Sequence, residues 1–455
     1  MLFGGAGDLA TRHLLPALLH LRRHQQLPHD FSVLGVGRDD LTPSGYRELV
    51  ERALRSRVPE ATDDERTWLL GAVDYVSVEL TERTDLRAVS GSGPTLFYCA
   101  LPPWAYRPVL IALARAGLPR GSRLVLEKPV GEDLTSAQEV HRLAHSLVDE
   151  GSVFRVDHFL HHQVVQDVLC LRLANPFLRA AWSHEHIESV EILWEESEGV
   201  RERAAYFDRA GTVKDMMQSH LLQLLALVAM ELPSRWEAGD LPIHREAALR
   251  QVRSIDAREA NSRTMRARYV AGQVHNQPVE AYASTPGVLA ERATETYAAV
   301  ALEVDAARWQ GVPFVLRSGQ AIGSPRRHIE VRFRAVPGAP AGHSTVLRLE
   351  MVPSQITLEM AVVGSDGFPD LTNSALTAQR PEQSLPASAR LIRDVLAGRQ
   401  GLFVTEGEVE QCWRVTDSVA SAWAAAGTPL VSYAAGSSAP RMPPGVLSDV
   451  CEHTP

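Results

Sequence analysis

The stretch LFGGAGDLATRHLLPALL, residues 2–19, decides the fold class of the first half of the chain. A short apolar run passes through three glycines, Gly4, Gly5 and Gly7, into a segment with apolar residues at helical spacing. Glycines at such a junction let the backbone approach a pyrophosphate, and the free N–H groups of the next helix face that charge. The spacing is not the common G-x-G-x-x-G, so a plain glycine turn is the alternative, but the strand–glycine–helix order favours nucleotide binding. Only Met1–Phe3 precede the glycines, so the first strand is either short or begins upstream of this sequence.

Apolar runs alternate with helical patterns over roughly the first 135 residues. The runs MLF (1–3), FSVLGVG (31–37), TLFYCA (95–100) and RLVLEKP (123–129) have the composition of buried parallel strands. Segments with apolar residues at helical spacing separate them. This alternation of strand-like and helical segments predicts an α/β Rossmann domain with a doubly wound sheet. We expect residues 1–150 to form an NAD(P)-binding domain.

The alternation of apolar runs with helical segments ends after about residue 180. The runs ESVEILWEE, TETYAAVALEVD, HIEVRFRAV and STVLRLEMV are rich in β-formers and have no helix between each pair. They predict an α+β domain over residues 151–455, with a large, mostly antiparallel sheet. We expect helices near 213–230 and 387–396 to lie against that sheet. The last twenty residues, rich in Gly, Pro and Ser, are expected to wrap the surface or fray.

Size and composition limit the classes of function. The chain has 455 residues, 45% of them apolar, which fits two domains of an ordinary globular protein. A net charge of −9 argues against broad affinity for nucleic acid or for anionic membranes. The longest apolar run, residues 221–232, is shorter than the roughly 20 residues of a membrane span, and no secretory signal precedes the first motif. Four cysteines without metal spacing fit a reducing compartment, so we expect a cytoplasmic enzyme.

The end of the second predicted strand bears on the choice of cofactor. It reads GVGRDD, which places Arg38 and Asp39 where a dinucleotide ribose is recognised. An acidic residue there holds the 2′-hydroxyl of NAD, whereas an arginine accommodates the 2′-phosphate of NADP. Arg38 therefore favours NADP, and Asp39 keeps NAD possible. An exposed loop charge is the alternative for Arg38.

Several segments together resemble the glucose-6-phosphate dehydrogenase family. They are GGAGDLA (4–10), FYCALPP (97–103), EKPVG (127–131), RVDHFLHHQ (155–163), YAAGSSAP (433–440) and two long stretches, 203–233 and 292–319. They occur in the family's order along nearly the whole chain. The resemblance implies a Rossmann domain followed by an α+β domain, assembly as a homodimer or homotetramer through the large sheet, and oxidation of a hexose at C1 to a lactone with NADP, or with NAD.

The resemblance also implies roles for individual residues. It places the cofactor against Gly4, Gly5, Gly7, Asp8, Leu9, Arg38, Ala100, Leu101, Pro102 and Lys128. It implies that His220 is the general base, that Asp157 is its carboxylate partner, and that Lys128 lies near both cofactor and sugar. A neutral histidine suits removal of the C1 hydroxyl proton, and a carboxylate on its other nitrogen stabilises the imidazolium that forms. Without the resemblance, His220 in an apolar helix reads as a core histidine.

Sugar contacts are implied at His158, His162, Glu196, Asp215, Gln320 and Lys128. Glu196 lies in a run of acids for which simple solvation is the alternative. The family's phosphate-binding tyrosine and two lysines are replaced by Phe159, His162 and Gln320. One hypothesis is a hexose with a different or absent C6 phosphate. The rival hypothesis is a phosphate site rebuilt with His158, His162 and Arg326 or Arg327.

A third hypothesis is a dinucleotide-binding paralogue that has lost catalysis. The retained Asp157, Lys128, Asp215 and His220 argue against it, because the changes fall on the anion site instead.

The three histidines in RVDHFLHHQ raise the question of a metal site. In a helix, His158, His161 and His162 would share one face at i, i+3 and i+4. Their spacing lacks the known zinc patterns and hydride transfer needs no metal, so we expect no metal there. A structural role is the preferred interpretation for His161.

Overall fold

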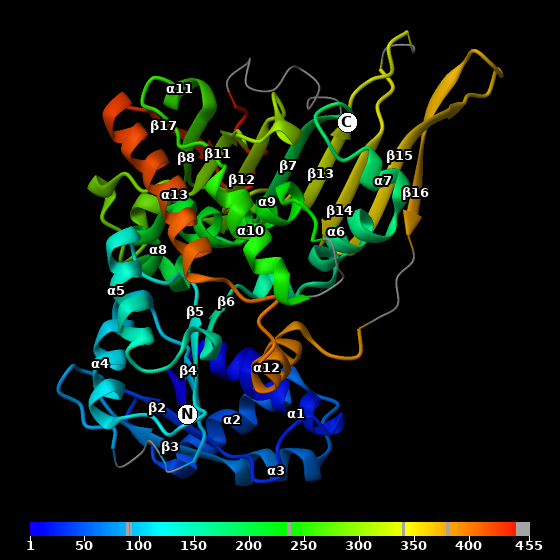
Figure 1. The fold of residues 1–455 in the computed structure, drawn as a ribbon. Coiled ribbons are helices and arrows are strands. Elements are labelled where there is room, and N and C mark those ends of the chain that lie inside the picture. Colours follow the sequence, from blue (N-terminus) through cyan, green and yellow to red (C-terminus); the bar gives the residue numbers. More distant parts are fainter. Residues whose placement is uncertain (88–90, 92, 234–237, 339–341, 379–382, 443–455) are drawn as a thin grey trace. The chain divides into compact units, whose positions relative to one another are not determined.

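The computed structural model describes residues 1–87, 91, 93–233, 238–338, 342–378 and 383–442. The chain forms two compact units (Figure 1). The first comprises Met1–His161, Trp236–Pro242 and Glu382–Glu410, and the second comprises His162–Arg235, Ile243–Pro381 and Gln411–Pro455. The chain therefore leaves the first unit and returns to it twice.

A six-stranded parallel sheet forms the centre of the first unit. Its strands are β1 (Leu2–Phe3), β2 (Val33–Gly37), β3 (Val73–Ser77), β4 (Leu96–Cys99), β5 (Arg123–Glu127) and β6 (Val153–Val156). They pair in the order β3-β2-β1-β4-β5-β6, which is the order of a doubly wound dinucleotide-binding sheet. The expected Rossmann sheet is confirmed. The first segment of the unit ends at His161, eleven residues beyond position 150, and includes β6, which pairs with β5.

Helices connect these strands. They are α1 (Leu15–Arg23), α2 (Pro43–Arg57), α3 (Asp63–Ala72), α4 (Tyr106–Ala116) and α5 (Leu134–His145), with a π-helical turn η1 (Ala10–Leu14) leading into α1. Their starts follow the usual capping chemistry. The Thr42 hydroxyl accepts the Gly45 N–H at 3.1 Å, and Thr62 and Glu65 form a capping box.

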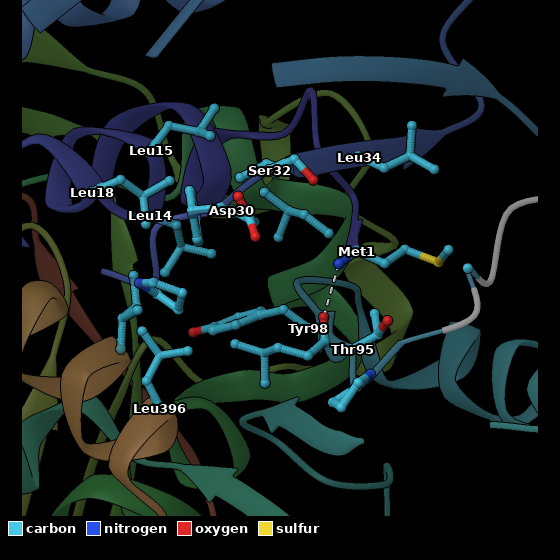
Figure 2. A pocket seen from close by; sticks show the side chains of 18 residues that line it. Met1, Leu14, Leu15, Leu18, Asp30, Ser32, Leu34, Thr95, Tyr98 and Leu396 are labelled. Carbon is cyan, nitrogen blue, oxygen red and sulfur yellow. Dashed lines mark hydrogen bonds between the residues drawn. The ribbon is translucent and has the colours of Figure 1, made fainter. Parts of the chain in front are cut away.

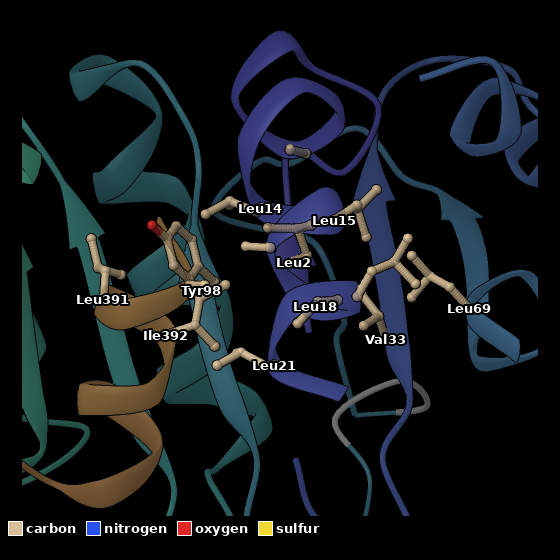
Figure 3. Packing of buried hydrophobic residues seen from close by; sticks show 14 of the residues in the cluster. Leu2, Leu14, Leu15, Leu18, Leu21, Val33, Leu69, Tyr98, Leu391 and Ile392 are labelled. Carbon is tan, nitrogen blue, oxygen red and sulfur yellow. The ribbon is translucent and has the colours of Figure 1, made fainter. Parts of the chain in front are cut away.

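One later helix completes the core of the first unit. The helix near 387–396 was expected to lie against the antiparallel sheet, and that expectation is wrong. The observed helix α12 (Ala387–Ala397) carries its apolar stripe into the first unit, where Leu391 and Ile392 join a cluster that includes Leu14 and Tyr98 (Figure 3). Both helix residues are at most 5% exposed, so α12 is part of this core and not a surface appendage.

A nine-stranded mixed sheet forms the second unit. Its strands are β7 (Ile187–Glu195), β8 (Thr264–Val270), β11 (Tyr297–Leu302), β12 (Phe314–Gly319), β13 (Arg327–Phe333), β14 (Val346–Met351), β15 (Ser354–Val363), β16 (Leu371–Ala378) and β17 (Leu430–Ala434). They pair in the order β16-β15-β14-β13-β7-β12-β11-β8-β17. Only the pairs β7–β12 and β8–β17 are parallel, so the expected mostly antiparallel sheet is confirmed.

The remaining elements of the second half are short apart from one long helix. They are α6 (Gln163–Ala174), α7 (Pro176–Ala180), α8 (Ala204–Thr212), the π-helical segment η6 (Val213–Leu221), α9 (Leu222–Ala229), α10 (Leu241–Arg250), α11 (Ala260–Arg263), the hairpin of β9 (Gly272–Val274) and β10 (Gln277–Val279), and α13 (Glu406–Ala426). The helix expected near 213–230 corresponds to η6 and α9.

The edge of the large sheet at β15 and β16 is unusually open. Every residue of β16 after Leu371 is exposed, and Leu376 is 59% exposed. Val363 of β15 and Phe368 in the connecting turn are 57% and 87% exposed. Exposed apolar side chains grouped along one hairpin are typical of an interaction surface.

Three expectations concern the tail, the cysteines and membranes. The tail is hydrogen-bonded to the second unit at Gly436 and Ser437, and residues 443–455 lie outside the described part of the chain. Cys99, Cys170 and Cys412 are free. Within the described residues, no helix combines the length and the apolarity that a bilayer crossing requires.

Candidate active site

Expected cofactor residues, and the expected catalytic residue Asp157, follow the carboxyl ends of the parallel strands. Gly4 follows β1, Arg38 follows β2, Ala100 follows β4, Lys128 follows β5 and Asp157 follows β6. Since all six strands run in the same direction, the segments that leave their carboxyl ends meet at one edge. In open α/β sheets this edge binds dinucleotides, at the point where the strand order reverses. Here the order reverses between β1 and β4.

Tight packing explains why glycines follow β1. Gly4 has φ +76°, and a Cβ on it would lie 2.2 Å from the carbonyl oxygen of Ala100. A Cβ on Gly5 would lie 2.7 Å from the Cα of Gly35 in β2. Only glycine allows this turn, and the turn leads directly into η1 and α1. The positive end of that helix therefore starts beside the strand ends, which fits a pyrophosphate.

The end of β2 fits a phosphorylated ribose. Arg38 and Asp39 are both exposed, and Arg38 has no ion pair among the described residues. Its guanidinium is therefore available to a 2′-phosphate. Asp8, at the glycine turn, is also exposed and pairs with Arg12 at 3.2 Å.

The end of β5 is buried and rigid. The hydroxyl groups of Tyr98 and Tyr106 donate hydrogen bonds to the carboxylate and to the carbonyl of Glu127. Burial raises the pKa of Glu127 to about 7. Lys128 follows, half-buried, with a cis peptide bond to Pro129. The lysine thus directly follows the buried end of β5 at the carboxyl edge.

Asp157 is held in place directly after β6. It is 1% exposed, and its Oδ1 accepts the N–H of Phe159 at 3.0 Å. Burial raises the pKa of Asp157, while His158, the Phe159 N–H and Lys128 act in the opposite direction. A buried carboxylate fixed by a backbone hydrogen bond is suited to orienting another polar group.

The three histidines do not share one helical face. His158–His161 form a 3-10 turn and α6 begins after His162, so the condition for a shared face, one continuous helix, is not met. His158 is exposed, while His161 is buried with its ring 5.2 Å from that of Phe403 and its Nε2 4.0 Å from Asp394. This environment supports the structural role expected for His161. Phe159 is likewise buried, at 2% exposure.

In the second unit, η6 carries both Asp215 and His220. They are 1% and 2% exposed. Residues five apart lie about 140° apart around an α-helix, at about 100° per residue. The i to i+5 hydrogen bonds of a π-helix instead place such residues one turn apart, on the same side. The π-helical geometry of η6 therefore brings the two side chains of this pair to one side of the segment.

A glycine kink sets the start of η6. Gly211 has φ +65° and ψ 176°, a region that is essentially restricted to glycine. A Cβ on Gly211 would lie 2.5 Å from Oε1 of Glu295, the atom that accepts the Val213 N–H at 3.1 Å. Glu295 is 9% exposed, so its carboxylate has little room to move.

Two partners of Asp215 were missed from the sequence. Nη2 of Arg203 lies 2.7 Å from Oδ2 of Asp215, and the Tyr206 hydroxyl donates to Oδ1 at 3.4 Å. The pKa of Arg203 is raised, chiefly by the nearby charge of Asp215 and to a smaller extent by Glu196. The segment that carries the family resemblance contains both residues, but only the fold shows that they contact Asp215.

Glu196 is part of a hydrogen-bonded group rather than a solvated acid. Its two carboxylate oxygens accept the Nε1–H of Trp194 at 3.1 Å and the Nε2–H of Gln320 at 2.7 Å. The guanidinium of Arg327 lies 5.1 Å from the Trp194 ring. Nε of Arg326 lies 3.5 Å from the neighbouring Glu195. Glu196, Gln320 and both arginines are therefore close to one another in the second unit.

An apolar pocket of about 500 Å³ lies elsewhere in the first unit (Figure 2). Its lining includes Val33 and Leu96, the first residues of β2 and β4, and the Met1 amino group that donates to the Leu96 carbonyl at 2.8 Å. These residues mark the amino edge of the sheet. The pocket is thus at the edge opposite the candidate cofactor site.

Comparisons with known families cover almost the whole chain. Residues 1–167 match the family model described as glucose-6-phosphate dehydrogenase, NAD binding domain. Residues 169–449 match the model described as glucose-6-phosphate dehydrogenase, C-terminal domain. Both halves are thus similar to parts of the same family, in the same order.

Individual relatives agree with the family models. The chain is 35% identical to glucose-6-phosphate 1-dehydrogenase of Gluconobacter oxydans, over 98% of this chain and 95% of that relative. It is 35% identical to the enzyme of the same name from Mycolicibacterium smegmatis, over 97% and 94%. A solved structure of glucose-6-phosphate dehydrogenase in complex with glucose-6-phosphate superposes with a TM-score of 0.86 at 27% identity, covering 99% of this chain and 96% of that one. The glucose-6-phosphate 1-dehydrogenase of Mycobacterium avium gives 0.82 at 29% identity, covering 96% and 93%.

Proposed function

Because the chain belongs to the glucose-6-phosphate dehydrogenase family, we propose that it oxidises glucose 6-phosphate at C1 to the lactone, with NADP as the hydride acceptor. The observation that carries the proposal is the placement of Asp215 and His220, buried on one side of a π-helical segment. Asp215 is held by Arg203 and Tyr206, so the position of its carboxylate on this segment is fixed.

The carboxyl edge of the parallel sheet supplies the dinucleotide site. The turn at Gly4, Gly5 and Gly7, with Asp8 and Leu9 at the start of the helix, would hold the pyrophosphate through backbone N–H groups. Arg38 pairs with the 2′-phosphate, which makes NADP preferred over NAD. Ala100, Leu101 and Pro102 line the path toward the nicotinamide. When bound, the nicotinamide accepts two electrons as a hydride.

His220 acts as the general base. The C1–H bond breaks with its electron pair as the hydride leaves, and the C1 hydroxyl proton passes to the imidazole as the lactone carbonyl forms. We propose that Asp157 accepts the other ring N–H of His220, which fixes the tautomer and stabilises the imidazolium. Lys128 positions the C1 hydroxyl relative to the nicotinamide.

Carboxylates in the second unit position the sugar. Asp215 and Glu196 accept hydrogen bonds from ring hydroxyl groups, and each is already oriented by protein donors. Arg203 and Tyr206 hold the Asp215 carboxylate in place, and Trp194 does the same for Glu196. Prearranged acceptors reduce the entropy lost when the sugar binds.

The C6 phosphate has an unusual environment in this proposal. His158, His162 and Gln320 are the contacts expected from the family pattern, together with Arg326 or Arg327. Phe159 is buried and cannot donate a hydrogen bond, and the Gln320 amide already donates to Glu196. The two arginines near Glu196 supply fixed charge that offsets the missing lysines.

These same features favour one second candidate, a hexose with a different or absent C6 phosphate. Charge-assisted contacts are worth roughly 1.5–3 kcal/mol each, so two missing contacts change affinity by a hundredfold or more. The test is kcat/KM for glucose 6-phosphate against glucose, with NADP and with NAD. A strong preference for the phosphorylated sugar supports the main proposal, whereas equal or better use of glucose supports the second.

Catalysis itself is tested with His220→Asn. The variant is expected to lose at least about a hundredfold in kcat, while NADP binding, measured by fluorescence titration, stays unchanged. His24→Asn, at an exposed position of the first unit, is the matched control and keeps full activity. Failure of the unaltered chain to oxidise any aldose or sugar phosphate, with NADP still bound, would instead support the non-catalytic paralogue.

We further propose a cytoplasmic homodimer, or a homotetramer built from it, that associates through β15 and β16. The exposed apolar residues Val363, Phe368 and Leu376 support this surface, and the free described cysteines support a reducing compartment.

A further inference from the structure

A small polar cavity in the second unit lies among residues that the proposed reaction does not use. Its volume is about 140 Å³, which is room for several waters and therefore for one tetrahedral oxyanion. It is lined by three arginines, one glutamate, one tryptophan and one leucine, namely Arg172, Arg179, Arg308, Glu231, Trp182 and Leu232. Three guanidiniums and one carboxylate give these side chains a net charge of +2. A cavity of this size and sign is suited to a small anion.

Arg172, on α6, is the buried charge of this cavity. It is 1% exposed, and its Nη1 and Nη2 each donate at 2.6 Å, to the carbonyls of Leu227 and Met230 at the end of α9. Since the carboxyl end of a helix is negative, these two bonds explain why a guanidinium is tolerated here. They leave the Nε–H of Arg172 without a hydrogen-bond partner among the described residues. A buried charged donor without an acceptor is costly, so an acceptor in the cavity would be stabilising.

The neighbouring charges leave Arg172 without a carboxylate of its own. Arg308, in the 3-10 turn η10 (Ala307–Trp309), holds both oxygens of Glu231, with its Nε and Nη2 at 2.6 and 2.9 Å. The pKa of Arg172 is lowered to about 9, first by burial and then by the charge of Arg308, which outweighs the opposite effect of Glu231. Glu231 therefore balances Arg308, and the charge of Arg172 stays unbalanced.

Arg179, on α7, brings a third guanidinium to the cavity. It is exposed, and within the described part of the chain its side chain forms neither an ion pair nor a hydrogen bond. Arg308, in contrast, is fixed by Glu231 and by the Trp182 carbonyl, which accepts its Nη1–H at 2.9 Å. The cavity thus combines a buried guanidinium, a fixed one, and one that is free to move onto a ligand.

We propose that this cavity binds one inorganic phosphate ion through Arg172, Arg179 and Arg308. Guanidinium groups recognise such oxyanions by charge-assisted hydrogen bonds. The Glu231 carboxylate makes the site selective, because phosphate at neutral pH carries a proton that a carboxylate accepts, whereas sulfate has none. The volume leaves little room for an organic group, so the ligand is free phosphate and not a sugar phosphate. The bound ion connects α7 with η10 and with the end of α9, and it thereby stabilises the second unit.

The test is isothermal titration of the full chain with potassium phosphate near neutral pH, in the presence of saturating NADPH and glucose 6-phosphate. These two ligands do not react with each other and occupy the proposed cofactor and sugar sites. We expect one phosphate to bind per chain, and sulfate, the matched control ion, to bind at least roughly tenfold more weakly. Arg179→Gln should weaken phosphate binding by roughly tenfold or more, because one charge-assisted contact is lost. Arg258→Gln, at an exposed position of the same unit, is the matched control and leaves the affinity unchanged.

A second measurement keeps the outcome clear if a variant folds poorly. At equal ionic strength, phosphate should raise the melting temperature of the unaltered chain and of Arg258→Gln more than sulfate does. This difference should disappear in Arg179→Gln and return in part in Arg179→Lys, which keeps the charge. The proposal is overturned if the unaltered chain binds no phosphate, if sulfate binds as tightly as phosphate, or if Arg179→Gln binds phosphate as tightly as the unaltered chain.

Discussion

The kink at Gly211 gives the sharpest test of how the fold positions Asp215 and His220. At φ +65° and ψ 176°, an alanine costs about 1–3 kcal/mol in backbone strain. Its Cβ would also lie 2.5 Å from Oε1 of Glu295, so the carboxylate must move and lose its hydrogen bond to Val213, at about 1 kcal/mol. We therefore expect Gly211→Ala to lower the free energy of unfolding by about 2–4 kcal/mol.

The same substitution is also expected to lower catalytic activity, because η6 begins two residues later and carries Asp215 and His220. If the strain is relieved by a shift of η6, kcat/KM falls by roughly tenfold or more, since about 1.4 kcal/mol corresponds to a factor of ten. Urea unfolding and steady-state kinetics measure the two effects. Gly71→Ala, in α3 with open space around its Cα, is the matched control and is neutral or slightly stabilising. A Gly211→Ala variant as stable and as active as the unaltered chain would refute the reasoning.

Three further predictions use other features. The Glu127 carboxyl has its pKa raised from 4.5 to about 7, so its contribution to stability is present below pH 4.5 and is lost as pH rises through 7. In urea titrations between pH 5 and 8, the free energy of unfolding of Glu127→Gln should therefore rise by up to about 3 kcal/mol relative to the unaltered chain. A difference that does not depend on pH would contradict this. Arg203→Gln should raise the KM for the sugar by roughly tenfold with a smaller change in kcat, because Asp215 loses a charged partner at 2.7 Å, and Arg203→Lys should restore part of the loss; an unchanged KM would argue against this positioning role. Leu376→Asp should convert a dimer to monomers in light scattering, whereas Leu289→Asp, at 47% exposure, should not; a Leu376→Asp chain that stays dimeric would place the interface elsewhere.

The alternation of apolar runs was enough to predict a parallel sheet and four of its six strands, but not β3 or β6. The four predicted strands correspond to β1, β2, β4 and β5, because buried parallel strands are apolar throughout. β3, with the sequence VDYVS, was missed since Asp74 and Ser77 interrupt its apolar pattern. α12 was assigned to the wrong unit because its apolar stripe does not specify which core it completes. Periodicity reports that a face is buried, but not the partner against which it packs.

Some residues of the candidate site were predictable from the sequence, and others were not. The glycines and Arg38 could be interpreted from local chemistry, because a turn and a strand end act where they occur in the sequence. The pairing of Arg203 with Asp215 and of Gln320 with Glu196 could not, since each depends on a tertiary contact.

The inclusion of α12 in the first core has a consequence for biosynthesis. During translation, Leu14, Leu21 and Tyr98 have no complete set of neighbours until residues 387–397 leave the ribosome, although the parallel strands were made long before. The nascent amino-terminal half therefore exposes apolar surface while most of the polypeptide is still being synthesised. It depends on chaperones, or on the late docking of α12, to avoid aggregation. A stop codon placed between β6 and α12 would be expected to yield an insoluble product, even though all six strands of the Rossmann sheet are present.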